Sequence, residues 1–328
     1  MGWKKKVALY TALTASTLGT IHLLNRFTHF LATVDNALDN TKDNYYEWRF
    51  GNVYYSKVGS GKPILLVHDL NSASSSYEWN KIVDELSKTN TVYTLDLLGC
   101  GRSDKPNITY TNFLYVQLVT DFIKHIIKEK TDFVVTGESS SFILLCCANT
   151  DELIGQVMLI NPGSLTEQAK IPTKRTKVLK YLIDTPVIGT LLYNIVINKK
   201  TLNDTFRRFY FYDQNRVEEK CVQTYWESSQ KSGTKGKYLF SSIRSRYTNA
   251  NILFCLKNIT NNIYIICGNG NPEYATVASQ YQNQLPSIEI FELDQCKYLP
   301  QLERASDLLA QIQLLINDNP VEDQFHSA

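Results

Sequence analysis

The sequence has almost no net charge and few histidines, and each of these features excludes some classes of function. Lys and Arg total 34 against 32 for Asp and Glu, which gives a formal net charge of +2. The chain has no surplus of basic residues that would favour binding to a nucleic-acid backbone. It also has no surplus of acidic residues that would indicate a solvated tail. With only five histidines in the chain, a catalytic base has few candidates. We expect no nucleic-acid partner, no metal site and no other cofactor.

Cysteine pairs with the spacing of a zinc or redox site are also missing. The seven cysteines are an odd number, none of them forms a Cys-x-x-Cys motif, and most interrupt apolar runs. Buried thiols are the better interpretation. This pattern favours a reducing compartment, or a secreted domain that does not rely on disulfides.

A long uncharged run lies near the start of the chain. Lys4–Lys6 precede Val7–Leu24, which contains no Asp, Glu, Lys or Arg and reaches the lower length limit of a membrane-spanning helix. A cleaved signal sequence and an ordinary or in-plane helix are the alternatives, because several threonines dilute the apolarity. We predict that residues 1–40 form a membrane-associating helix. If it spans the cell membrane, the lysines stay cytoplasmic and the main domain is exocytoplasmic.

From Tyr45 onward, short β-rich runs alternate with amphipathic ones, which is typical of a mostly parallel sheet covered by helices on both faces. The predicted strands are Tyr46–Phe50, Val53–Val58, Ile64–Val67, Val92–Asp96, Phe133–Thr136, Val157–Ile160, Ile263–Cys267 and Ile288–Leu293. The predicted helices are Tyr77–Ser87, Tyr115–Lys128, Ser139–Asn149, Glu273–Gln282 and Leu302–Ile316.

The alternation of predicted strands and helices is interrupted once. About one hundred residues separate Ile160 from Ile263, far more than a loop in a compact domain contains. Apolar residues recur there at helical spacing. We predict a helical lid over residues 163–237, inserted into a core made of residues 45–162 and 238–317.

The segment Gly137–Ser141, with the sequence Gly-Glu-Ser-Ser-Ser, has the form of a nucleophile elbow. It follows a predicted strand directly and opens an apolar helical run, as the elbow requires. The serine of such a turn is Ser139, and the backbone N–H of Ser140 would lie at a helix N-terminus, where an oxyanion is stabilised. The alternative interpretation is a cluster of helix-capping serines.

A second motif, His68-Asp69-Leu70, follows the predicted strand Ile64–Val67. In an esterase the loop at this place supplies the second oxyanion N–H, here that of Leu70. We interpret His68 as a structural residue that holds the loop. We expect His68 and Asp69 to line the pocket.

The third motif, Asp96–Ser103, is a strand end that runs into a glycine-rich turn. Here the chain resembles the α/β-hydrolase family, whose members carry an Asp-x-x-Gly-x-Gly-x-Ser turn between the oxyanion loop and the elbow. The resemblance extends from Tyr45 to about Ile316. It implies an α/β-hydrolase fold, with Ser139 as the nucleophile and Leu70 and Ser140 as the oxyanion donors.

The family pattern is broken at two positions. Asn271 stands where the triad acid is expected, and an amide orients an imidazole without stabilising its charge; the nearby Glu273 is a possible substitute. Tyr298 stands where the histidine is expected, and a phenol with a reference pKa of about 10 is a poor proton acceptor near neutral pH. Lys297 is the nearest alternative base, and it would need a strongly lowered pKa.

Two functions are therefore open. The first is a membrane-associated serine hydrolase that cleaves a small apolar ester or amide with Ser139 and a weakened triad. The second is a non-catalytic pseudo-hydrolase that binds a small apolar ligand or a protein partner. The altered triad positions favour the second function, and the family resemblance favours the first.

Overall fold

The computed structural model describes residues 2–38 and 44–317, and its centre is one eight-stranded sheet. The strands follow the order β1-β2-β4-β3-β5-β6-β7-β8. They are β1 (Asn44–Trp48), β2 (Gly51–Val58), β3 (Lys62–Val67), β4 (Asn90–Leu95), β5 (Thr131–Thr136), β6 (Ile154–Ile160), β7 (Ile263–Gly268) and β8 (Glu289–Leu293). Only the pairs β1–β2 and β2–β4 are antiparallel among the described strands. The predicted fold class, with eight mostly parallel strands, is confirmed.

Alternation along the strands divides the core into two layers, because successive side chains point to opposite faces of a sheet. In β3, Leu65 and Val67 pack in the larger apolar cluster, and Ile64 and Leu66 pack in the smaller one. The helices in chain order are α1 (Trp3–Thr33), α2 (Val83–Leu86), α3 (Asn112–Phe122), α4 (Ser140–Asn149), α5 (Leu165–Gln168), α6 (Lys174–Asp184), α7 (Ile188–Val196), α8 (Lys199–Thr205), α9 (Glu219–Thr234), α10 (Lys237–Arg244), α11 (Leu253–Leu256), α12 (Pro272–Gln284), α13 (Pro300–Glu303) and α14 (Ala305–Asn317).

The long interval between β6 and β7 contains the helices α5 to α11. Part of this insertion has its own apolar cluster, in which Phe206 and Tyr225 pack with Leu299 and Leu302 of the core. The insertion therefore packs against the segment around Tyr298. The boundaries predicted for the lid, residues 163–237, remain a prediction.

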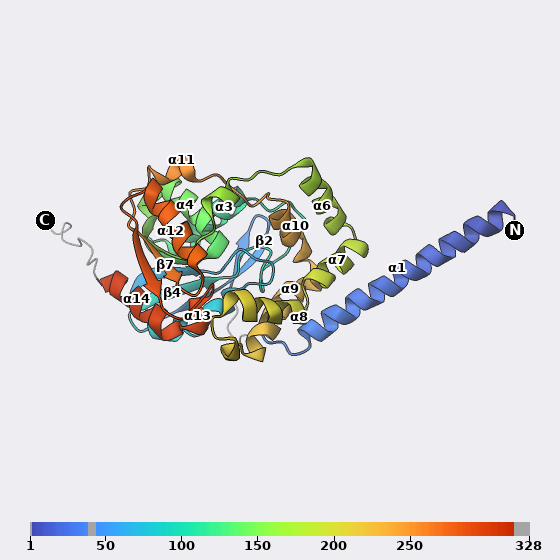
Figure 1. The fold of residues 1–328 in the computed structure, drawn as a ribbon, viewed down its shortest axis with the longest axis horizontal. Coiled ribbons are helices and arrows are strands. Elements are labelled where there is room, and N and C mark those ends of the chain that lie inside the picture. The colour runs from blue at the N-terminus through green and yellow to red at the C-terminus, as the bar shows by residue number, and fades with distance from the viewer. Residues whose placement is uncertain (1, 39–43, 318–328) are drawn as a thin grey trace.

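Helix α1 leaves the body of the molecule as a long rod (Figure 1). Its most apolar 18-residue window has a mean hydropathy of 1.4, and none of that window is buried. Among the described helices it is the one long and apolar enough to cross a membrane. Its last turns pack against α9 and α7, where Asn25 and Ala32 are buried. The helix is thus free at one end and attached to the lid at the other.

Candidate active site

The sharp turn after β5 belongs to Gly137, two residues before the serine that the sequence indicated. Gly137 has a φ of +58°, whereas Ser139 has the helical values φ −63° and ψ −21°. A nucleophile elbow places its nucleophile on a strained strand-to-helix turn, and a positive φ is the mark of such strain. In the structure Gly137, which has no side chain, therefore occupies the turn, and the role of Ser139 as the nucleophile remains a prediction.

Ser139 lies in the first turn of the helical segment, and its side chain faces the protein interior. Its hydroxyl donates a hydrogen bond of 2.6 Å to the backbone carbonyl of His68, and the residue is fully buried. A carbonyl accepts a hydrogen bond but takes no proton at neutral pH. This contact ties the turn to the end of β3 and does not activate the hydroxyl.

Both ring nitrogens of His68 are engaged by the backbone. The N–H of Leu97 donates to His68 Nε2 at 3.0 Å, so the ring proton is on Nδ1, which donates to the carbonyl of Asp69 at 2.7 Å. Burial lowers the pKa of His68 to about 4. Both ring nitrogens are therefore occupied, and neither can accept a proton from Ser139.

The place of an oxyanion is taken by a side chain of the protein. The N–H of Glu138, the residue after the turn, donates to Asp69 Oδ1 at 2.9 Å. The N–H of Ser140 instead donates to the carbonyls of Gly137 and Glu138. In the structure this N–H is therefore taken up by the helical segment, and the role of Ser140 as an oxyanion donor remains a prediction. Leu70 follows Asp69 at the end of β3, as expected, and its role as a donor remains a prediction.

Tyr298 reaches the turn, as its position in the sequence implied, but it bonds to a carboxyl group. A Cβ atom added to Gly137 would lie 1.9 Å from Tyr298 Oη and 2.4 Å from Asp69 Oδ1. The hydroxyl is hydrogen-bonded to Asp69, and the ring stacks on Tyr210 of the lid with centroids 5.3 Å apart. Burial and the Asp69 carboxyl raise the pKa of Tyr298 well above its usual range. The phenol is a hydrogen-bond donor here.

Asp69 belongs to a buried carboxyl pair that the sequence did not reveal. Its N–H donates to Glu78 Oε2 at 3.2 Å, and Glu78 also accepts from Tyr225 and Gln301 at 2.9 and 3.2 Å. Burial and the neighbouring carboxylates raise the pKa of Asp69 to about 8, and burial raises that of Glu78 to about 7. The pair therefore carries protons near neutral pH.

The two remaining candidates, Asn271 and Lys297, make their hydrogen bonds to other residues than Ser139. Asn271 caps α12, and its side chain accepts from the N–H of Glu273 at 3.1 Å. Lys297 Nζ donates to the carbonyl of Arg208 at 3.0 Å. Neither side chain contacts the turn through a hydrogen bond given by the structure, and the lysine is oriented toward the lid. Lys297 is therefore not placed as a base for Ser139.

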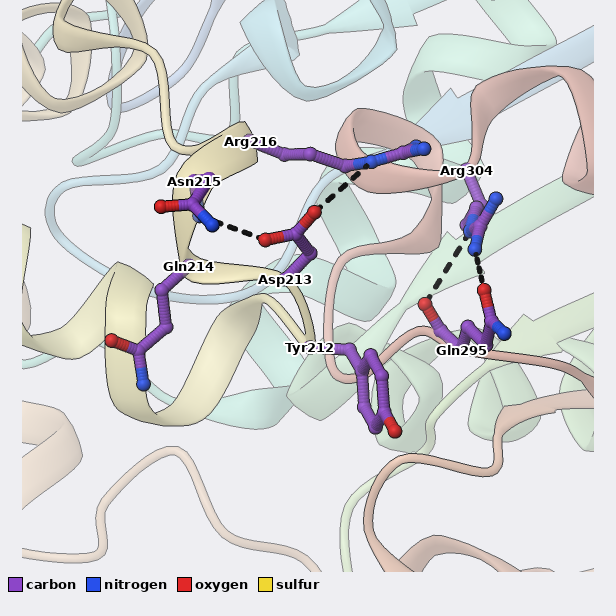
Figure 2. Close-up of a pocket in the computed structure, with 7 residues that line it drawn as sticks. All are labelled: Tyr212, Asp213, Gln214, Asn215, Arg216, Gln295 and Arg304. Atoms are coloured by element: carbon purple, nitrogen blue, oxygen red, sulfur yellow. Dashed lines mark hydrogen bonds and ion pairs between the residues drawn. The ribbon is translucent and has the colours of Figure 1, made fainter.

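A polar pocket of about 520 Å³ lies where the lid meets the core (Figure 2). Its lining includes two arginines, and both are engaged. Arg216 pairs with Asp213 at 3.7 Å, and Arg304 donates to the carbonyl of Gln295 at 3.4 Å. None of the residues that the sequence indicated lines this pocket, and its polar walls do not suit the predicted apolar ester.

One sequence signal could have located the turn. The predicted strand ends at Thr136, which leaves no residues between the strand and Gly137. In the structure the strand also ends there, and the turn follows at once. The Asp69–Glu78 pair has no comparable signal, because its members meet only when the loop after β3 folds back.

Solved structures of other proteins have a similar fold. A serine hydrolase involved in carbazole degradation superposes with a TM-score of 0.68 at 14% identity, and the match covers 84% of this chain and 98% of that one. A membrane phospholipase A, described as a bacterial virulence factor, has a TM-score of 0.64 at 17% identity and covers 96% of this chain and 98% of its own. At such identities the likeness concerns the fold.

Curated relatives match shorter regions. An uncharacterized protein of Mycobacterium tuberculosis is 28% identical over 114 residues, 35% of this chain and 33% of the relative. The 2-hydroxy-6-oxo-6-(2'-aminophenyl)hexa-2,4-dienoic acid hydrolase of Metapseudomonas resinovorans is 34% identical over 71 residues, 21% of this chain and 24% of the relative. These matches thus span a third or less of either relative. The model of the alpha/beta hydrolase family matches residues 64–312, and the chain belongs to that family.

Proposed function

We propose that this chain is a membrane-tethered member of the alpha/beta hydrolase family that has lost serine-hydrolase chemistry and acts by binding. The observation that carries the proposal is the turn after β5, where Gly137 offers no nucleophile. Tyr298 Oη and Asp69 Oδ1 fill the space that a side chain at Gly137 would need. A covalent mechanism requires a nucleophile with a base in reach, and the turn has neither.

The contacts around the turn support a stable closed arrangement. Asp69 holds the N–H of Glu138, which in an active hydrolase of this fold would be aimed at the developing charge. Tyr298 bonds to Asp69 and stacks on the lid. The polar groups of Asp69, Glu138 and Tyr298 thus pair with one another, which is the arrangement expected of a retained scaffold.

The tether is the second part of the proposal. Helix α1 is 31 residues long, and the length and apolarity of its free part suit a membrane span. The three lysines before the apolar run favour a cytoplasmic start and an exocytoplasmic main domain. The ligand of such a protein would be a small apolar molecule or a partner protein at the membrane.

A fluorophosphonate probe tests the loss of chemistry. We expect the full chain in detergent micelles to show no labelling above the level of Ser139→Ala, because the Ser139 hydroxyl donates to a carbonyl and contacts no base. An active serine hydrolase in the same sample controls for the probe. Mass spectrometry would locate any label. A label at Ser139 that disappears in Ser139→Ala would reinstate the competing hypothesis, a serine hydrolase of a small ester or amide.

A further inference from the structure

Large apolar side chains are exposed on one part of the lid, and we call them the lid patch. They are between 40% and 75% exposed. The lid patch consists of Ile171, Val178, Tyr181, Leu182, Ile188, Leu192 and Ile195. Large exposed apolar side chains gathered on two neighbouring helices, α6 and α7, mark a site of interaction.

The lid patch follows the outer faces of two helices. In α7, Ile188, Leu192 and Ile195 recur at intervals of four and three, so they share one face. Tyr193, on the opposite face, is buried against Phe240 with ring centroids 5.3 Å apart. In α6, Val178 and Leu182 form the corresponding row. The inner faces hold the lid together, and the outer faces have no protein partner among the contacts described.

The position of the lid patch relative to α1 indicates what covers this exposed apolar surface. The uncharged stretch of α1 ends at Arg26, which marks the level where a spanning helix leaves the hydrocarbon. One residue earlier, Asn25 Nδ2 donates to the carbonyl of Val187 at 2.9 Å, and Asn25 Oδ1 accepts from Asn194 at 3.0 Å. Val187 directly precedes α7, so α7 lies at the level where α1 enters the membrane.

Figure 1 shows α6 and α7 along the margin of the body from which α1 emerges. The first turn of α6 adds a second observation. Lys174, Arg175 and Lys177 are exposed there, although cations at a helix N-terminus oppose the helix dipole. Basic side chains beside apolar ones suit a lipid surface, where their long stems extend toward anionic headgroups.

We propose that the lid patch lies in the interfacial layer of the same bilayer that α1 crosses, with the basic turn of α6 on anionic lipid headgroups. The inference rests on the proposed tether, and it adds a second and independent membrane contact. The lid is then fixed to the lipid surface by α1 on one side and by its own apolar faces on the other.

Spin labels on the full chain in vesicles of phosphatidylcholine and phosphatidylglycerol test the proposal. In a Cys255→Ser background, single labels replace Ile195, Tyr181, Leu13 of α1, or Phe254. Phe254 of α11 is the matched control, because it is apolar and 82% exposed and lies at the end of the body away from α1 (Figure 1). Collision with lipid-soluble oxygen is compared with collision with a water-soluble nickel chelate.

We expect the ratio of oxygen to nickel collisions to be several-fold higher at Ile195, Tyr181 and Leu13 than at Phe254. If Leu13 is in lipid while Ile195 and Tyr181 resemble Phe254, the lid proposal is overturned and the tether stands. If Leu13 is also exposed to nickel, the tether fails, and the lid proposal with it. Labels at Ile195 and Tyr181 that are shielded from both reagents would indicate a protein contact, such as a second copy, and would also overturn it.

Discussion

Replacing four residues is expected to give this chain a strong esterase activity. The changes are Gly137→Ser, Asp69→Gly, Tyr298→His and Asn271→Asp. Together they remove the atoms that a side chain on Gly137 would meet, since those atoms belong to Tyr298 and Asp69. They also free the N–H of Glu138, which now donates to Asp69. We expect hydrolysis of a short acyl ester to rise at least about 10³-fold, because loss of a whole triad costs about 10⁶ in a serine protease.

Two control variants show which residue carries the gain. The pair Tyr298→His and Asn271→Asp, which keeps Gly137, is expected to remain at background, since histidine has no hydroxyl to activate at the turn. Adding Ser139→Ala to the fourfold variant is expected to leave the gain intact. Initial rates with a chromogenic ester measure all of these. Activity in the double variant that disappears with Ser139→Ala would mean that the assignment of the turn to Gly137 is mistaken.

The free energy of unfolding is expected to fall by about 2 to 3 kcal/mol between pH 6.5 and pH 8, because each unit of pKa shift is worth about 1.4 kcal/mol. The pKa values of Asp69 and Glu78 are raised to about 8 and about 7 in the folded protein. Unfolded carboxyls are ionised throughout this range, so the folded state binds more protons and stability decreases as pH rises. Their contribution is fully present only below the unfolded pKa values.

Two further buried groups, His68 and Lys105, affect the free energy of unfolding outside the interval from pH 6.5 to 8. The pKa of His68 is lowered to about 4, so its preference for the neutral form adds stability as pH rises from about 4 to 6.5. Burial lowers the pKa of Lys105 to about 8, and the resulting gain in stability with pH begins only above that value. The interval from pH 6.5 to 8 therefore reports on buried carboxyls, among which Glu138 also has a pKa raised by burial.

The substitution Asp69→Asn tests whether the carboxyl of Asp69 causes the fall in the free energy of unfolding between pH 6.5 and pH 8. The amide does not titrate, whereas burial still raises the pKa of Glu78 to about 7. We therefore expect the fall in the free energy of unfolding over this interval to shrink to the contribution of Glu78, about 1 kcal/mol. Urea unfolding of the full chain in detergent, at pH 6.5 and pH 8, provides the values. Ser139→Ala, a neighbour that does not titrate, should keep the slope of the unmodified chain. Equal slopes in Asp69→Asn and the unmodified chain would refute the explanation.

The sheet could be predicted from the sequence because each strand is a short apolar run bounded by turn residues. All eight predicted strands are present, and the end of β5 at Thr136 is placed correctly. The helix boundaries were less reliable: the stretch predicted as Tyr77–Ser87 is a 3-10 turn at Ser76–Trp79 followed by the short α2. Local pattern fixes which segments pair, and tertiary contacts decide where helices begin and end.

The site was harder to predict, because its decisive feature is a backbone angle. The motif Gly-x-Ser-x-Ser fits the elbow with Ser139 as the nucleophile, whereas the structure gives the positive φ to Gly137, two residues earlier. The carboxyl of Asp69 reaches the N–H of Glu138 across 69 positions of the chain. Tyr298, predicted to stand at the altered histidine position, lies at the turn, yet its partner could not be read from its neighbours in the sequence.

The attachment of α1 to the lid has a practical consequence for producing the protein. Beyond Asn25, the helix provides the carbonyl of Ala32 to Gln223 at 3.2 Å, and His29 donates to the carbonyl of Gln230 at 2.9 Å. A fragment shortened to begin after this helix would leave these polar groups of α9 without partners, at a cost of about 1 to 3 kcal/mol for each buried one. Truncation for solubility would therefore weaken the packing of α9 as well as remove the proposed anchor, and the chain with α1, solubilised in detergent, is the better sample.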